Sequence, residues 1–175
     1  MKEIADHIID LIENSIRADA KHISVVYKDD GDKKSFCIED NGKGMSSEEV
    51  SRALDPFYTT KTSKRIGLGL SLTRQSVLQS HGVFHLYSTP KKGTKVIFTY
   101  PKKDIDCPPN GDIIKSMVQS IMAHPDIDFS LSYQEKENVL VDTSFLNYEE
   151  RLSIKYSDLY AYVEEAYVEI DWNGF

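Results

Sequence analysis

The chain has 175 residues, of which 40% are hydrophobic, and its formal net charge is −7. This composition excludes a disordered protein and predicts one medium-sized domain, or a domain of about 100 residues with an appendage. No apolar run approaches the roughly 20 residues of a membrane span, and the acidic start does not resemble a signal peptide. Cys37 and Cys107 show no paired spacing. We therefore expect a cytoplasmic protein without a membrane partner, a disulfide framework or a zinc site.

The first predicted element is a helix over residues 2–18, where isoleucines recur at steps of three and four residues. Asp10 and Asn14 are four residues apart, so their side chains point the same way. A solvated polar face is the ordinary interpretation of that spacing. Alternatively, Asn14 is a suitable magnesium ligand, with a carboxylate one turn away to orient water.

Strands are predicted at residues 22–28 and 35–39, where apolar residues alternate. The second strand delivers Asp40 to its end, within residues 40–45 (DNGKGM). A carboxylate beside two glycines can accept hydrogen bonds from a base or a sugar while the backbone passes close by. Residues 46–54 begin with a capping box and predict a short helix.

Residues 57–66 show no periodicity and predict a loop. Within it, residues 59–65 are basic and rich in hydroxyl groups, which suits closing over a polyphosphate. A second long helix is expected over residues 67–80. It opens with GLGL at residues 67–70, and a helix N-terminus with free N–H groups binds anions. Strands follow at residues 83–88 and 94–100. Together these patterns predict a nucleotide site with a flexible lid.

A change of charge divides the chain. Residues 1–103 hold 17 basic and 13 acidic side chains, whereas residues 104–175 hold 4 and 15. This asymmetry predicts two units, a domain over residues 1–103 that holds the nucleotide site and a small acidic α+β accessory domain over residues 104–175. The acidic second unit argues against a nucleic-acid partner, because phosphate backbones require clustered Lys and Arg.

The second unit is predicted to begin with a linker at residues 104–111 and a helix at 113–123. Alternating residues at 128–133 and 139–143 predict a β-hairpin. Residues 148–172 are broadly helical, with a break near Ser157. The tyrosines of this last helix are expected to pack against the hairpin, and no chemistry is evident in this half.

Four short runs in the first half resemble the motifs of the gyrase, heat-shock chaperone, histidine-kinase and MutL ATPase superfamily. Residues 10–15 (DLIENS) resemble its asparagine motif, and residues 40–45 and 67–70 resemble its two glycine motifs. Thr94 resembles the threonine that closes the adenine pocket. The resemblance implies an α/β (α+β) two-layer sandwich, the Bergerat fold, in which helices cover one face of a mixed sheet and Mg–ATP lies under a lid.

The resemblance also implies roles for single residues. Asp40 would bind the adenine amino group, with Thr94 supporting it through water. Asn14 would hold Mg²⁺, while Lys61 would meet the terminal phosphates. The implied nucleotide-binding residues are Asn14, Asp40, Gly42, Gly44, Met45, Lys61, Gly67, Leu68, Gly69, Leu70 and Thr94.

Two departures from the superfamily pattern bear on catalysis. Asp10 stands where hydrolysing members usually carry a Glu, which is one methylene longer. Asp10 is therefore the candidate general base, and slow hydrolysis is expected because a base must reach its proton. The histidines are scattered and lack the context of a phospho-acceptor, so a self-phosphorylating sensor kinase is not predicted.

Three functions remain open. The first is a stand-alone ATP-binding regulator that phosphorylates or conformationally controls a separate protein, as the serine kinases that hold sigma factors do. The second is a slow ATPase assisting assembly of a hydrogenase-type redox complex. Residues 104–112 and 124–129 suggest it, since they resemble small ATP-binding proteins encoded beside such enzymes. The third is a non-catalytic, nucleotide-gated module. The expected partner is a redox-enzyme subunit or a regulator, and a dimer is left open.

Overall fold

The computed structural model describes residues 3–55, 68–133 and 139–173. Its elements are, in order, α1 (Ile4–Arg17), β1 (His22–Asp29), β2 (Lys33–Asp40), α2 (Ser47–Ala53), α3 (Leu68–Gln79), β3 (Val83–Thr89), β4 (Gly93–Pro101), α4 (Ile113–Ala123), β5 (Asp128–Tyr133), β6 (Val139–Asp142), α5 (Tyr148–Ser153) and α6 (Tyr156–Asn173). The types and order of the predicted elements are confirmed. The break expected near Ser157 instead precedes Tyr156, and the loop predicted at 57–66 lies outside the described residues.

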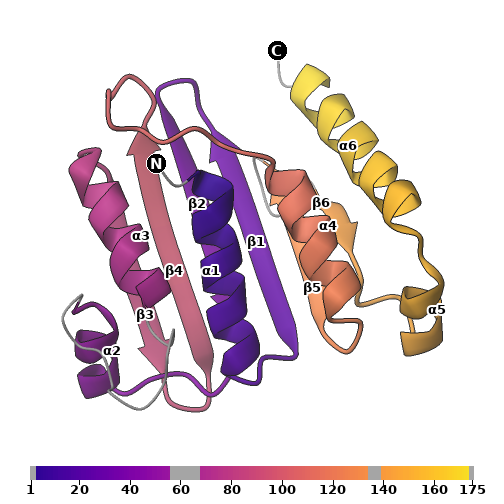
Figure 1. Cartoon of the computed structure of the whole chain (residues 1–175), viewed down its shortest axis with the longest axis horizontal. Coiled ribbons are helices and arrows are strands. Elements are labelled where there is room, and N and C mark those ends of the chain that lie inside the picture. The colour runs from indigo at the N-terminus through magenta and orange to yellow at the C-terminus, as the bar shows by residue number, and fades with distance from the viewer. Residues whose placement is uncertain (1–2, 56–67, 134–138, 174–175) are drawn as a thin grey trace.

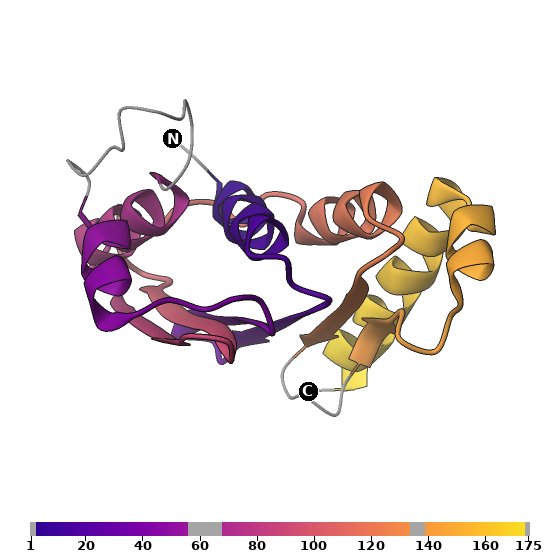
Figure 2. The same cartoon turned by 90° about the horizontal axis from the view of Figure 1, so that it is seen from below.

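The strands form one six-stranded sheet in the order β3-β4-β2-β1-β5-β6. Helices α1, α3 and α4 lie side by side over the same face of this sheet (Figures 1 and 2). Of the pairings between the described strands, β1 with β5 is parallel and the rest are antiparallel. The predicted two-layer sandwich with a mixed sheet and helices on one face is therefore confirmed.

The region after residue 103 continues the same sheet. The chain leaves β4, passes to the helical layer as α4 beside α1, and adds β5 along the other side of β1, from His22 opposite Asp128 to Tyr27 opposite Tyr133. Helix α6 lies beyond α4, at the β5–β6 end (Figure 1). The acidic half is therefore joined to the first half through backbone hydrogen bonds as well as through helix contacts.

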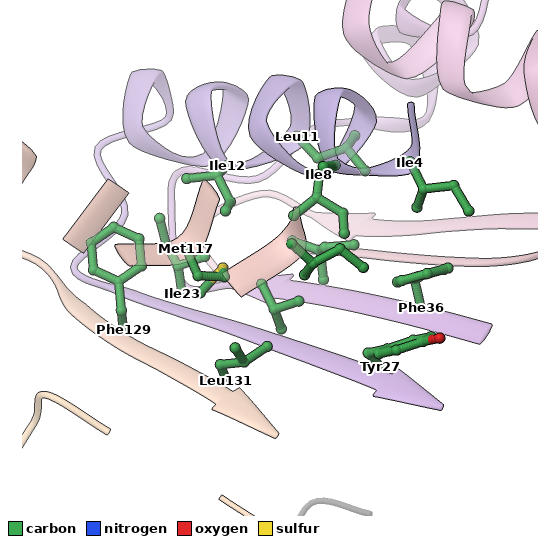
Figure 3. Close-up of a cluster of buried hydrophobic side chains, with 14 of the residues drawn as sticks. Ile4, Ile8, Leu11, Ile12, Ile23, Tyr27, Phe36, Met117, Phe129 and Leu131 are labelled. Carbon is green, nitrogen blue, oxygen red and sulfur yellow. The ribbon is translucent and has the colours of Figure 1, made fainter. Parts of the chain in front are cut away.

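The core lies between α1 and the sheet. The isoleucine pattern places Ile4, Ile8 and Ile12 on one stripe of α1, and all three are fully buried against the strands (Figure 3). Each such side chain contributes about 1.5–3 kcal/mol through removal of apolar surface from water. The Tyr27 and Phe36 rings stack in register across β1 and β2 with centroids 4.8 Å apart. This packing fixes α1, and the polar side chains at its edge, against the ends of the central strands.

Candidate functional site

A cavity of about 230 Å³ lies between α1, the end of β2, the start of β4 and the first turn of α3. It contains most of the described residues that the sequence singled out, although they come from four separate segments of the chain. The lining residues that were predicted are Asn14, Asp40, Gly44, Met45, Leu70 and Thr94. Apolar side chains such as Leu11, Ile38 and Val96 form the rest of the wall. The cavity is thus apolar with a few polar groups, as ligand sites usually are.

The Asp40 carboxylate is the most constrained polar group of this cavity. Oδ1 accepts hydrogen bonds from the backbone N–H groups of Gly42 (2.8 Å) and Thr94 (3.3 Å). Oδ2 accepts one from the Ser15 hydroxyl at 2.7 Å. Asp40 is only 9% exposed and Ser15 only 4%. A buried carboxylate costs free energy unless donors satisfy it, so these donors hold Asp40 in one position at the cavity wall.

The loop after Asp40 is fastened to the turns on both sides of it. The Asn41 side-chain oxygen accepts hydrogen bonds from the N–H groups of Lys21 and His22 at 2.8 and 2.9 Å. At Gly42 a Cβ would lie 2.6 Å from the Ala18 carbonyl oxygen, so another part of the chain already occupies that space. The first glycine motif therefore has a packing role in this structure.

Gly44 shows the same constraint more strongly. Its φ is +64°, which side chains rarely adopt, and a Cβ there would overlap the Thr89 carbonyl oxygen. Next to it, the Met45 N–H donates to Ser88 Oγ at 2.9 Å, and Ser88 Oγ also lies 2.9 Å from Thr94 Oγ1. The β3–β4 hairpin and the glycine loop are thereby joined at the edge of the cavity.

The first turn of α3 lies directly against the polar turn of α1. A Cβ at Gly69 would stand 3.0 Å from Asn14 Nδ2 and 3.1 Å from Asp10 Cβ. Asn14 Nδ2 is buried and has no hydrogen-bond partner among the described residues. An unsatisfied buried donor is rare in folded proteins and requires an acceptor. Since Asp10 and Asn14 are half-buried beside α3, their face of α1 is not simply solvated.

These groups fit a magnesium–polyphosphate ligand. Within the described ranges no cluster of three or more His, Cys, Asp or Glu side chains could hold a metal by itself. Mg²⁺ does not need such a cluster, because it binds through one or two protein oxygens together with phosphates and water. Asn14 can supply one such oxygen, its unpartnered Nδ2 could donate to a phosphate oxygen, and the N-terminus of α3 adds an anion-binding end. The residues present therefore suit Mg–ATP.

Some predicted residues are not placed, and others were missed. Lys61, Gly67 and the side chain of Leu68 lie outside the described part of the chain. The sequence analysis assigned no role to Ser15 or Ser88, although both form hydrogen bonds to residues that line the cavity. Ser15 is the last residue of the asparagine motif at residues 10–15, but no role of its own was predicted for it. Nothing in the local sequence marks Ser88, because its partners come from a turn and a loop remote in the chain.

The fold and site define a two-layer α/β sandwich with a polar-edged pocket at the strand ends. Residues 2–104 match the family of histidine kinase-, DNA gyrase B- and HSP90-like ATPases, and the chain belongs to this family. It is 33% identical over 97 residues to sporulation kinase A of Bacillus subtilis strain 168, which covers 54% of this chain and 16% of that protein. It is 27% identical over 118 residues to the phosphate regulon sensor protein PhoR of Haemophilus influenzae, covering 63% and 28%. The chain thus spans less than a third of these relatives.

A solved structure shares the fold over more of the chain. The N-terminal domain of a DNA repair protein matches with a TM-score of 0.61 at 17% identity, covering 87% of this chain and 56% of that one. Because 87% exceeds the share taken by residues 2–104, the likeness includes part of the region after β4. In the described residues no helix is long and apolar enough to cross a membrane.

Proposed function

We propose that this chain binds Mg–ATP in the cavity between α1, β2 and α3 and acts as a regulatory protein that phosphorylates or conformationally controls a separate partner. The observation that carries the proposal is the Asp40 carboxylate, held by Ser15, Gly42 and Thr94 at the wall of a cavity that also contains Asn14. The kinases among the relatives support the regulatory role. Cys37 and Cys107 form no disulfide in the described structure, which suits a cytoplasmic location.

Asp10 is the proposed base. It lies one turn before Asn14 on α1 and against Gly69 at the start of α3, the place where terminal phosphates would sit. In the transfer step a hydroxyl oxygen of the partner bonds to the γ-phosphorus and the bond to the β–γ bridging oxygen breaks. ADP leaves, and Asp10 accepts the hydroxyl proton. Asn14 would hold Mg²⁺, which would neutralise charge on the phosphates.

Calorimetric titration with Mg–ATP tests the binding step. Asp40→Asn should lower ATP affinity about 100-fold, because an amide would present a donor to one of the donors that now face the carboxylate. Glu39→Gln is the matched control, since Glu39 is the neighbouring acid, pairs with Lys95 and does not line the cavity. Equal ATP affinity in Asp40→Asn and the unaltered chain would refute the assignment.

Incubation with γ-labelled ATP and magnesium, alone and with lysate of the source cells, tests the chemical step after binding. Label on one other protein identifies a kinase and its target. Free phosphate without labelled protein favours the slow ATPase proposed for a redox complex. If ATP binds and neither product forms, the chain is a nucleotide-gated binding module.

A further inference from the structure

A second cavity, of about 400 Å³, lies at the other end of β1. It is bounded by the sheet at Tyr27 and Tyr133, by the first turn of α4 and by α6, the helix at the outer end of the molecule (Figure 1). Its described lining shares no residue with the first cavity. It is larger than the first cavity, so it has room for a small ligand of its own.

Tyrosine rings form its walls. Tyr27 and Tyr133 are neighbours on β1 and β5 with ring centroids 5.3 Å apart, and Tyr167 of α6 lies 4.8 Å from Tyr133. Tyr27 and Tyr133 are nearly buried, at 6% and 3% exposure, so their positions are fixed by the core. Tyr160 completes the aromatic lining from one turn of α6. Such rings offer flat faces that attract planar groups and cations.

The charge of the lining is negative. Asp112 and Glu164 line the cavity, and its described lining contains no Lys, Arg or His. Tyr160 donates a hydrogen bond to Asp112 Oδ2 at 3.3 Å. Burial first, and then Asp112 and Glu164, raise the pKa of the Tyr160 phenol. Asn110 Oδ1, in the same wall, is a buried acceptor without a partner among the described residues. Acceptors and carboxylates beside aromatic faces therefore favour a positively charged hydrogen-bond donor.

We propose that this tyrosine cavity is a second ligand site, separate from the nucleotide site, for a small planar organic cation such as an aromatic amidine. The aromatic body lies among the tyrosines, and the cationic group faces Asp112 and Glu164. The proposal goes beyond the proposed function and does not depend on it, since it uses neither ATP nor the first cavity.

Calorimetry and ligand-observed NMR on the full chain test the proposal with three probes of similar shape. Benzamidine is a planar cation, benzamide is neutral and benzoate is an anion. We expect saturable binding of benzamidine, at least about tenfold weaker binding of benzamide, and no binding of benzoate. Saturating Mg–ATP should leave benzamidine affinity unchanged, whether or not ATP itself binds.

Substitutions at two neighbouring residues test whether benzamidine binds in the tyrosine cavity. Glu164→Gln should weaken benzamidine about tenfold and leave benzamide unchanged, whereas Glu165→Gln, the next residue and outside the cavity lining, should change neither. Val168→Trp should abolish benzamidine binding by filling the cavity without unfolding the chain, since Val168 lines the cavity and is 56% exposed. The proposal is overturned if benzamidine does not bind, if benzoate binds as well, if ATP displaces it, or if both Glu variants act alike.

Discussion

The Ser15 hydroxyl on α1 donates a hydrogen bond to Asp40 Oδ2 at the end of β2, and the two oxygens are 2.7 Å apart. Both side chains are buried. This bond joins the asparagine motif directly to the first glycine motif, which are separated by a turn and two strands. The orientation of Asp40 in the cavity therefore depends on a residue of the neighbouring helix.

Ser15→Ala tests that dependence. The substitution leaves Asp40 Oδ2 without its closest donor, which costs about 1 kcal/mol, so ATP affinity should fall about fivefold to tenfold. Ser51→Ala on α2 is the control, because the Ser51 hydroxyl is exposed and bonds only the Ser47 carbonyl among the contacts described. Titration with Mg–ATP measures both. An affinity loss shared by the two variants would show that the Ser15–Asp40 bond is not its cause.

A comparison of alanine variants at Gly44 and Gly31 distinguishes the cost of backbone strain from the cost of steric overlap. Both have positive φ, +64° and +89°, but a Cβ at Gly44 would overlap the Thr89 carbonyl oxygen, whereas a Cβ at Gly31 would meet nothing within 4 Å. Gly31→Ala should therefore cost only the strain of left-handed backbone, about 1 kcal/mol. Gly44→Ala should lower the free energy of unfolding by more than about 3 kcal/mol. Urea denaturation measures the free energy of unfolding of both variants. Equal losses in the two would show that steric overlap at Gly44 adds nothing to backbone strain.

Asp10 sets the expected rate of phosphate release or transfer. Asp10→Glu should raise turnover of ATP because the longer side chain brings the carboxylate closer to the attacking oxygen, and Asp10→Asn should abolish it while ATP still binds. Glu13→Asp is a control on the same helix, since Glu13 pairs with Arg17 at 3.6 Å. Single-turnover measurements with labelled ATP give the rates. If Asp10→Glu left turnover unaltered, the length of Asp10 would not limit catalysis.

The Asp29–Lys102 ion pair gives the fold a pH dependence. Lys102 Nζ lies 2.8 and 3.0 Å from the two Asp29 carboxylate oxygens. Burial raises the pKa of Asp29, but hydrogen bonds from Lys102 and the Gly31 N–H outweigh it, so the pKa is lowered in the folded chain. A lowered pKa means that the carboxylate stabilises the fold above its unfolded pKa of about 3.9 and that this contribution is lost as pH falls through the folded value.

Lys102→Gln should therefore lower the free energy of unfolding at pH 7, and this difference should shrink below about pH 4. The control is Lys103→Gln. Lys103 pairs with Asp32, but the two side chains are 87% and 85% exposed, so water and salt screen that pair. Urea denaturation across this pH range should show no effect for the control. A constant difference at every pH would rule out the Asp29 pair as its source.

Local patterns were sufficient for the elements, and together with the motif resemblance they named six of the residues that line the cavity. The isoleucine steps specified α1, and the end of an alternating run placed Asp40 at a strand terminus. Two other features depend on distant contacts. The partner of β1 on its second side could not be predicted, since strand pairing across a crossover leaves no local periodicity. Likewise, a glycine motif does not reveal whether the missing side chain makes room for a ligand or, as at Gly44, for the Thr89 carbonyl.

The parallel β1–β5 pairing has a consequence for synthesis of the protein. When the ribosome has completed β4, strand β1 still exposes the backbone N–H and C=O groups that later pair with Asp128–Tyr133. An open strand edge of this length recruits other chains. The nascent protein must therefore keep this edge of β1 unpaired until β5 has emerged, so a premature stop after residue 103 should produce a fragment that is prone to aggregate.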